Sequence, residues 1–281
     1  MPVNNMTSEN FIQVNQDKCI KCGLCVKVCR GTLGMGEHGP EVVDNFCIAC
    51  GHCVAVCPNG ALDHKLAPLA NQVLLEAPSI LNADMAAHFL RSRRSVRSFQ
   101  RKRIPRETIE ELLTIAPFAP TACNSQGVSY HVVDDSVTLK GIISAIADWA
   151  KEDLKNGALG KSPWSKNTAN TIQRYFQYGE DTILRDAPCL IIATADNSSF
   201  HLGRDNTHFA LTYTQLYAPS LGLGTCWAGL FEYCAGAGYE PLLQLLKLPG
   251  GRSVTGAIIA GYPNYTFRRL VDRDPLQITW Q

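Results

Sequence analysis

Hydrophobic and polar positions follow regular spacings from about residue 83 to the end of the chain. Four stretches repeat apolar residues at helical spacing, and three others are the short apolar runs typical of strands. Because helices and strands interleave, the pattern predicts a layered fold of mixed type. The expected helices span 83–92, 106–116, 137–155 and 206–221, and the expected strands span 128–133, 189–195 and 253–260.

Residues 1–66 contrast with this pattern, because they hold no long periodic segment and are rich in Cys and Gly. Such a sequence is typical of a small fold held together by something other than a hydrophobic core. Residues 67–82 contain two prolines and no cysteine, which indicates a linker or a linking helix. We therefore predict an α+β protein with a small domain at 1–66, a linker at 67–82 and an α/β layered domain at 83–281, its central sheet flanked by helices.

Composition narrows the class of protein. With 46% hydrophobic residues in 281, the chain can bury a core, so intrinsic disorder is not expected. The 26 Lys and Arg against 25 Asp and Glu leave a net charge of +1, which argues against nucleic acid or an anionic membrane as partner. Residues 1–10 lack the pattern of an export signal, and no apolar run approaches the roughly 20 residues of a membrane span. We expect a cytoplasmic protein.

Eight of the 12 cysteines lie between Cys19 and Cys57, in two copies of the spacing C-x2-C-x2-C-x3-C. Disulfides are disfavoured without export, and zinc sites normally use two Cys pairs rather than this order. In this spacing, three thiolates hold one [4Fe-4S] cluster and the fourth Cys reaches a different cluster. The first cysteine set is then Cys19, Cys22, Cys25 and Cys57, and the second cysteine set is Cys47, Cys50, Cys53 and Cys29.

The stretch from about residue 15 to 64 resembles bacterial-type two-cluster ferredoxins. The resemblance implies one-electron transfer through two [4Fe-4S] clusters. His52 lies inside the second copy, where we expect it to tune that cluster rather than to bind it.

Eight basic residues and no acidic one lie between Arg91 and Arg106. A solvated charged face or a nucleic-acid patch is the simpler interpretation, and for 101–106 we favour the solvated face. Arg93, Ser95 and Arg97 differ, because alternate positions of an extended strand point to one side. Their guanidinium groups and hydroxyl can then converge on one anion. Because electrons leaving the clusters need an acceptor that links one-electron and two-electron chemistry, we expect a flavin phosphate there.

Four segments make the large domain resemble the nitroreductase family of FMN enzymes. The family's R-x-S-x-R/K entry matches 93–97, its A-P-S-x-x-N-x-Q-P loop matches 119–127 (APTACNSQG), and its L-G-L-G-T/S-C-W segment matches 221–227. Its G-Y-P followed by basic residues matches 261–263 with arginines at 268, 269 and 273. In the family, the second of these loops meets the flavin from the partner subunit, so the resemblance implies a homodimer.

The resemblance also implies which residues hold FMN. Phosphate contacts are expected from the arginines, and the amides of Ala228 and Gly229 are expected to donate to N5 of the flavin. No catalytic side chain is assigned, because FMN itself carries the chemistry. The expected FMN-binding residues are Arg93, Arg94, Ser95, Arg97, Pro120, Thr121, Ala122, Asn124, Gln126, Trp227, Ala228, Gly229, Arg269 and Arg273.

Two functions follow from these expectations. The first is an oxidoreductase that passes electrons from two [4Fe-4S] clusters to FMN and on to a small organic acceptor, such as a nitroaromatic, a quinone or an activated alkene. The second is a non-catalytic electron-transfer or redox-sensing module that relays electrons to a partner protein. Either a ferredoxin-type protein or NAD(P)H can be the electron donor.

Overall fold

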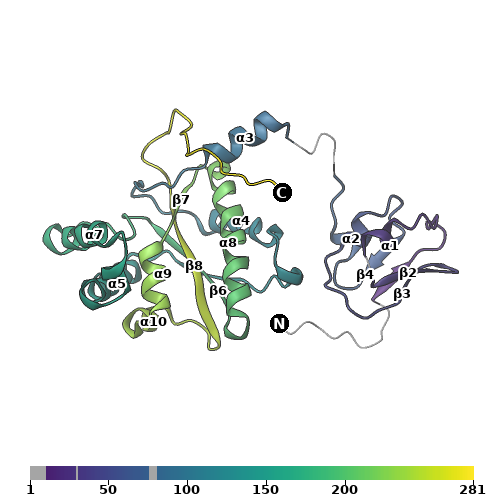
Figure 1. The fold of residues 1–281 in the computed structure, drawn as a ribbon, viewed down its shortest axis with the longest axis horizontal. Helices are drawn as coiled ribbons and strands as arrows, with labels where there is room; N and C mark the ends of the chain where they lie inside the picture. Colours follow the sequence, from purple (N-terminus) through teal and green to yellow (C-terminus); the bar gives the residue numbers. More distant parts are fainter. Residues whose placement is uncertain (1–10, 30, 76–80) are drawn as a thin grey trace. The chain divides into compact units, whose positions relative to one another are not determined.

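The computed structural model describes residues 11–29, 31–75 and 81–281. Contacts divide the chain into two units, the first made of 1–81 with 122–125, and the second of 82–121 with 126–281. Figure 1 shows both units. Residues 1–10 of the predicted small domain and residues 76–80 of the predicted linker lie outside the described residues.

In its described residues, the first unit consists of two small antiparallel sheets and two short helices. Each helix begins directly after a glycine in the left-handed region, Gly23 with φ 73° and Gly51 with φ 72°, where a side chain would be strained. The strands are β1 (Ile12–Val14) paired with β4 (Leu62–His64), and β2 (Leu33–Gly36) paired with β3 (Gly39–Val42). The two helices are α1 (Leu24–Val28) and α2 (His52–Ala55), and the 3-10 turn η1 (Leu69–Asn71) follows β4.

The second unit is built on a four-stranded antiparallel sheet in the order β5-β6-β8-β7. The central strand β6 buries every residue except its last, because both of its faces are covered. Leu190 and Ile192 belong to one buried cluster, and Ile191 and Ala193 belong to another. The strands are β5 (Ser129–Val133), β6 (Cys189–Asp196), β7 (Gly224–Trp227) and β8 (Arg252–Gly261).

Helices cover both faces of this sheet (Figure 1). Side chains of α5, α9 and α10 pack in one buried cluster, and those of α4 and α8 pack in the other. The helices of the second unit are α3 (Ala83–Ser92), α4 (Arg106–Thr114), α5 (Ser136–Asn156), α6 (Ala158–Lys161), α7 (Ser165–Tyr178), α8 (Phe200–Tyr217), α9 (Gly229–Gly236) and α10 (Glu240–Leu246).

The mixed fold class predicted from the sequence is confirmed. Residues 83–92 form α3, and the three predicted strands are present with bounds that differ by no more than one residue. The helix predicted at 206–221 begins earlier, at Phe200, and ends in the 3-10 turn η5 (Ala218–Leu221). Within the described chain, no helix is both long enough and apolar enough to cross a bilayer.

Candidate functional site

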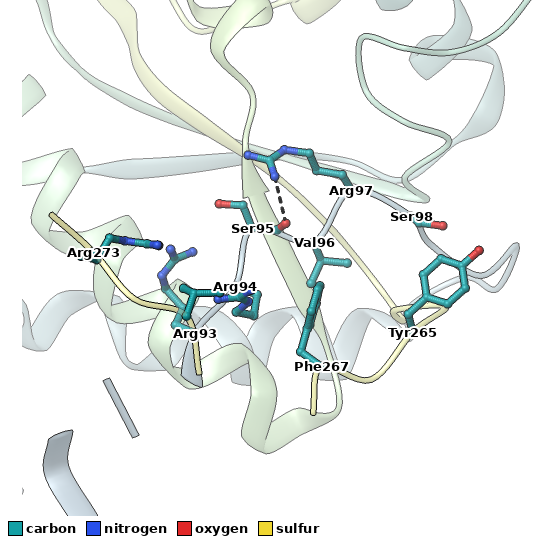
Figure 2. Close-up of a pocket in the computed structure, with 10 residues that line it drawn as sticks. Arg93, Arg94, Ser95, Val96, Arg97, Ser98, Tyr265, Phe267 and Arg273 are labelled. Atoms are coloured by element: carbon teal, nitrogen blue, oxygen red, sulfur yellow. Dashed lines mark hydrogen bonds between the residues drawn. The ribbon is translucent and has the colours of Figure 1, made fainter. Parts of the chain in front are cut away.

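A cavity of about 430 Å³ in the second unit lies between the segment after α3 and the C-terminal tail (Figure 2). We call it the arginine cavity. Among its lining residues, all within the described part of the chain, four are arginines and none is Asp or Glu. The lining consists of Arg93, Arg94, Ser95, Val96, Arg97, Ser98, Tyr265, Phe267, Val271 and Arg273.

The segment after α3 is held in place by strand β7. The amide of Val96 donates to the carbonyl of Thr225 at 2.9 Å, and Ser95 forms a parallel bridge with Thr225. The other end of this segment is fixed by an antiparallel β-bridge between Phe99 and Pro263. Two β-bridges, at Ser95 and Phe99, therefore hold this segment in place, and the convergence of Arg93, Ser95 and Arg97 on one anion stays a prediction.

Three of the four cavity arginines contact neutral groups. The guanidinium of Arg94 lies 4.9 Å from the ring centroid of Phe267, and Nη1 of Arg273 donates to the carbonyl of Asp272 at 3.0 Å. Nη1 of Arg97 donates to the carbonyl of Ser95 at 3.5 Å. Among the described residues, none of these arginines is ion-paired with a carboxylate. Their charge is therefore available to an anionic ligand.

Two arginines in the rest of the basic run are ion-paired. Arg103 and Arg106 form ion pairs with Asp134 at 3.4 and 3.2 Å. The hydrogen bond from Arg106 holds the pKa of the Asp134 carboxyl below its ordinary value. This pairing agrees with the expected solvated face at 101–106.

The cavity brings together five of the predicted flavin-binding residues, namely Arg93, Arg94, Ser95, Arg97 and Arg273. Arg269 is exposed and lies outside the lining. Sequence reasoning missed Tyr265 and Phe267, although two aromatic residues at alternate positions between the G-Y-P segment and the arginines were a usable signal.

The last residue of β7 and the residue after it are hydrogen-bonded within the fold. Nε1 of Trp227 donates to Oε2 of Glu232 at 2.5 Å, and the amide of Ala228 donates to the carbonyl of Ala257 at 2.9 Å. Donation from the Ala228 amide to the flavin would compete with this hydrogen bond, and it stays a prediction. Gly229 begins α9, and a Cβ there would meet no heavy atom within 4 Å.

The predicted loop at 120–126 lies outside the lining of the arginine cavity. Pro120 and Gln126 are exposed, and the amide of Gln126 donates to Oγ1 of Thr121 at 3.1 Å. Ala122 and Asn124 group with the first unit, where Nδ2 of Asn124 donates to the carbonyls of residues 48 and 49 at 3.0 and 3.1 Å.

The cysteines of the first unit gather as the two predicted sets. All members of the first cysteine set line one cavity, together with Gly23 and Pro58. In the second cysteine set, burial raises the pKa of Cys53 to about 11, and the nearby Cys29, Cys47 and Cys50 contribute to the shift. The fourth Cys of each copy therefore lies beside the first three of the other copy.

The surroundings of these thiols fit cluster ligands. Each of the 12 cysteines, all of which the structure describes, is a free thiol. Backbone amides point at the sulfurs, with Ala61 N 3.2 Å from Sγ of Cys57 and Ala49 N 3.4 Å from Sγ of Cys47. Such donors stabilise the thiolate form that binds iron.

A glycine lets the backbone approach the first cysteine set. Gly39 has φ 117°, and a Cβ on it would lie 3.2 Å from Sγ of Cys19. Among the described residues, no three Cys, His, Asp or Glu side chains are close enough to share a single metal ion. A [4Fe-4S] cluster does not require this, because each thiolate binds a different iron.

Taken together, the two units define a protein with a unit whose eight thiols gather in two sets, joined to an α+β unit that holds a cavity lined by four arginines. Residues 90–262 match the model of the nitroreductase family, and residues 11–58 match the model of the 4Fe-4S dicluster domain. The chain therefore belongs to the nitroreductase family, with a 4Fe-4S dicluster domain in its N-terminal part.

Solved structures share the fold of the second unit. A nitroreductase from Bacteroides fragilis with bound FMN is 21% identical, covers 71% of this chain and 100% of its own, and gives a TM-score of 0.54. A nitroreductase from Desulfitobacterium hafniense with bound FMN is 18% identical, with coverages of 72% and 100% and a TM-score of 0.55. An iodotyrosine deiodinase bound to FMN and 3-iodo-L-tyrosine is 18% identical, with coverages of 69% and 98% and a TM-score of 0.53.

Proposed function

We propose that this chain is an oxidoreductase in which electrons pass from two [4Fe-4S] clusters to FMN and then to a small organic acceptor. The observation that carries the proposal is the arginine cavity, which has four guanidinium groups and no carboxylate in its lining. Structural neighbours of the same family bind FMN, whose phosphate matches such a cavity in charge.

Arg93 and Arg273 hold the FMN phosphate in this proposal, because guanidinium groups form paired, charge-assisted hydrogen bonds with phosphate oxygens. Figure 2 shows both arginines at one end of the cavity, with Ser95 and Arg97 further along. Ser95 supplies a hydroxyl for the ribityl region. Arg97 places a positive charge near the pyrimidine side of the ring, which favours the reduced, negatively charged form. Bound FMN supplies the link between one-electron and two-electron chemistry.

The two cysteine sets hold the clusters. Each set contributes four thiolates, three from one copy of the motif and one from the other. Because both sets lie in the first unit, two clusters bound there form a path for single electrons. A low-potential ferredoxin-type protein or NAD(P)H delivers the electrons.

A second subunit completes the flavin site. Pro120, Thr121 and Gln126 lie outside the arginine cavity of their own chain, and the corresponding family loop reaches the flavin of the partner subunit. This supports a homodimer, and we propose that the homodimer works in the cytoplasm. The organic acceptor, a nitroaromatic, quinone or activated alkene, then binds over the flavin ring.

Anaerobic reoxidation tests this function. Purified protein is analysed for iron and FMN, reduced under anaerobic conditions and mixed with a nitroaromatic, a quinone or an enone. We expect about eight Fe and one FMN per chain, and reoxidation faster than that of free reduced FMN at equal concentration. Reoxidation no faster than that of free FMN, in protein with full cofactor content, would favour the relay module. Far less iron, or zinc in its place, would refute the iron–sulfur part.

A further inference from the structure

The two copies of the cysteine motif are followed by equivalent strands. Strands β2 and β4 each begin with a buried leucine, Leu33 with 3% and Leu62 with 2% of its surface exposed. Counting two residues on from each leucine gives Met35 in the first copy and His64 in the second. The copies supply the same ligands to their clusters, but they differ at this position.

Met35 belongs to the surroundings of the first cysteine set. It lines the cavity that contains all four thiols of that set, and its Cε lies 4.0 Å from the position of a Cβ on Gly23. A thioether has no hydrogen to donate, so Met35 offers the sulfurs only an apolar contact.

His64 belongs to the surroundings of the second cysteine set. Its Nε2 lies 3.4 Å from Sγ of Cys47. Its Nδ1 accepts hydrogen bonds from the amides of Leu66 at 3.0 Å and Ala67 at 3.2 Å. Because two amides point at Nδ1, the ring proton is on Nε2, and the ring donates it to the sulfur of Cys47.

The ring of His64 is held in this orientation from several sides. The residue is 2% exposed, and its ring centroid lies 5.3 Å from that of Phe11. Oδ1 of Asp63 accepts from the amides of His64 at 2.7 Å and Leu69 at 2.8 Å, which fixes the turn that supplies the two amides. The donor is therefore preorganised toward the sulfur.

We propose that His64 makes the cluster of the second cysteine set easier to reduce than the cluster of the first, so that electrons move from the first cluster to the second. A hydrogen bond to a ligand sulfur stabilises the extra negative charge of the reduced cluster and raises its reduction potential. One electron leaves the first cluster, which is oxidised, and enters the second, which is reduced. This inference rests on the ligand sets of the proposed function.

The substitution His64→Met tests the inference, because it gives the second cluster the same neighbour as the first. Holoprotein is titrated potentiometrically, and both clusters are followed by electron paramagnetic resonance, with Cys22→Ser used to assign the signals. We expect the midpoint of the second cluster to become more negative, the midpoint of the first to stay unchanged, and the gap between them to shrink. His64→Gln, which retains an N–H donor, is expected to restore part of the shift.

The control is His52→Met, since His52 lies between Cys50 and Cys53 in the sequence but is exposed. We expect no shift in that variant. Unchanged midpoints in His64→Met holoprotein with full iron content would overturn the role of His64 and leave the proposed function standing. Low iron in the wild-type protein would instead refute the ligand sets.

A second measurement applies if His64→Met loses the cluster. Wild-type protein and His52→Met are labelled with [15N]histidine, reduced and measured by pulsed electron paramagnetic resonance. A 15N coupling to the second cluster that persists in His52→Met supports the hydrogen bond from His64. Absence of 15N coupling to that cluster refutes it.

Discussion

Val96 packs directly over Gly224, so closely that a Cβ on Gly224 would lie 2.5 Å from Cγ2 of Val96. The amide of Val96 also donates to the carbonyl of Thr225, the next residue of β7. Two cavity arginines, Arg94 and Arg97, lie within two residues of Val96 in the chain. The position of the arginines therefore depends on the absence of a side chain at residue 224.

Gly224→Ala tests this dependence. The added methyl must push the segment at 93–98 away from β7, because overpacking a fitted contact costs about 1–3 kcal/mol. We expect a lower free energy of unfolding in urea and weaker binding of FMN to the apoprotein. Gly236→Ala is the matched control, since a Cβ there meets no heavy atom within 4 Å. Equal FMN affinity in Gly224→Ala and wild type would show that β7 does not position the arginines.

Arg93→Ala and Arg273→Ala test the phosphate site. Each removes charge-assisted hydrogen bonds worth about 1.5–3 kcal/mol, so the Kd for FMN is expected to rise about 10- to 100-fold. Riboflavin, which has no phosphate, is expected to bind both variants as it binds the wild type. Fluorescence titration of apoprotein with each flavin measures the difference.

Two further variants serve as controls for the phosphate site. Arg103→Ala removes a basic residue that is paired with Asp134, and Arg269→Ala removes an arginine outside the lining. Neither is expected to change the Kd for FMN by more than a few-fold. A loss in Arg269→Ala as large as that in Arg273→Ala would place Arg269 in the site, as the sequence had indicated.

The sequence predicted those elements whose apolar pattern was long and regular. Strand β6 begins with an unbroken apolar run over 189–193, and α3 begins after Asn82, whose side chain accepts from the amide of Met85 at 2.9 Å. Strand β7 was missed, because four residues carry no period and its pairing with β8 comes from distant sequence. Helix α7 was missed because it is largely polar and buries only Ile172.

Local sequence patterns likewise predicted only part of the surroundings of the cysteine sets and of the arginine cavity. Local spacing was enough to predict the cysteine sets and the arginines before β7. Which of the C-terminal arginines lines the cavity depends on the path of the C-terminal tail, and local spacing does not determine that path. The position of His52 inside the motif favoured it as the histidine that tunes a cluster, yet its side chain is exposed. The histidine that contacts a cluster thiol is His64, and its ring is oriented toward Cys47 by the turn after β4.

The ion pair at Asp134 predicts a pH dependence of stability. Arg106 donates to this carboxylate at 3.2 and 3.3 Å and lowers its pKa in the folded protein. Stability from such a group is complete above the unfolded pKa of about 3.9, and it is lost as the pH falls through the folded pKa. Asp134→Asn is therefore expected to lower Tm at pH 7, with a difference from wild type that shrinks as the pH falls below about 4.

Thermal unfolding followed by circular dichroism between pH 3 and pH 7 measures this effect. Glu152→Gln is the control, because Glu152 pairs with Lys155 on the exposed surface of α5, where ion pairs contribute little. A difference between Asp134→Asn and wild type that stays constant over the whole range would rule out the ion pair as its source.

Double cysteine variants test the exchange of the fourth ligand between the two copies. If Cys57 belongs with the first cysteine set, Cys22→Ser/Cys57→Ser removes two ligands of the same cluster and leaves about four Fe per chain. If Cys29 belongs with the second set, Cys22→Ser/Cys29→Ser damages both clusters and leaves far less iron. Iron content and electron paramagnetic resonance of anaerobically prepared protein separate these results. If Cys22→Ser/Cys29→Ser instead retained more iron than Cys22→Ser/Cys57→Ser, each copy of the motif would hold its own cluster. In that case Cys22 and Cys29 would bind the same cluster, although the fold places Cys29 beside the thiols of the second copy.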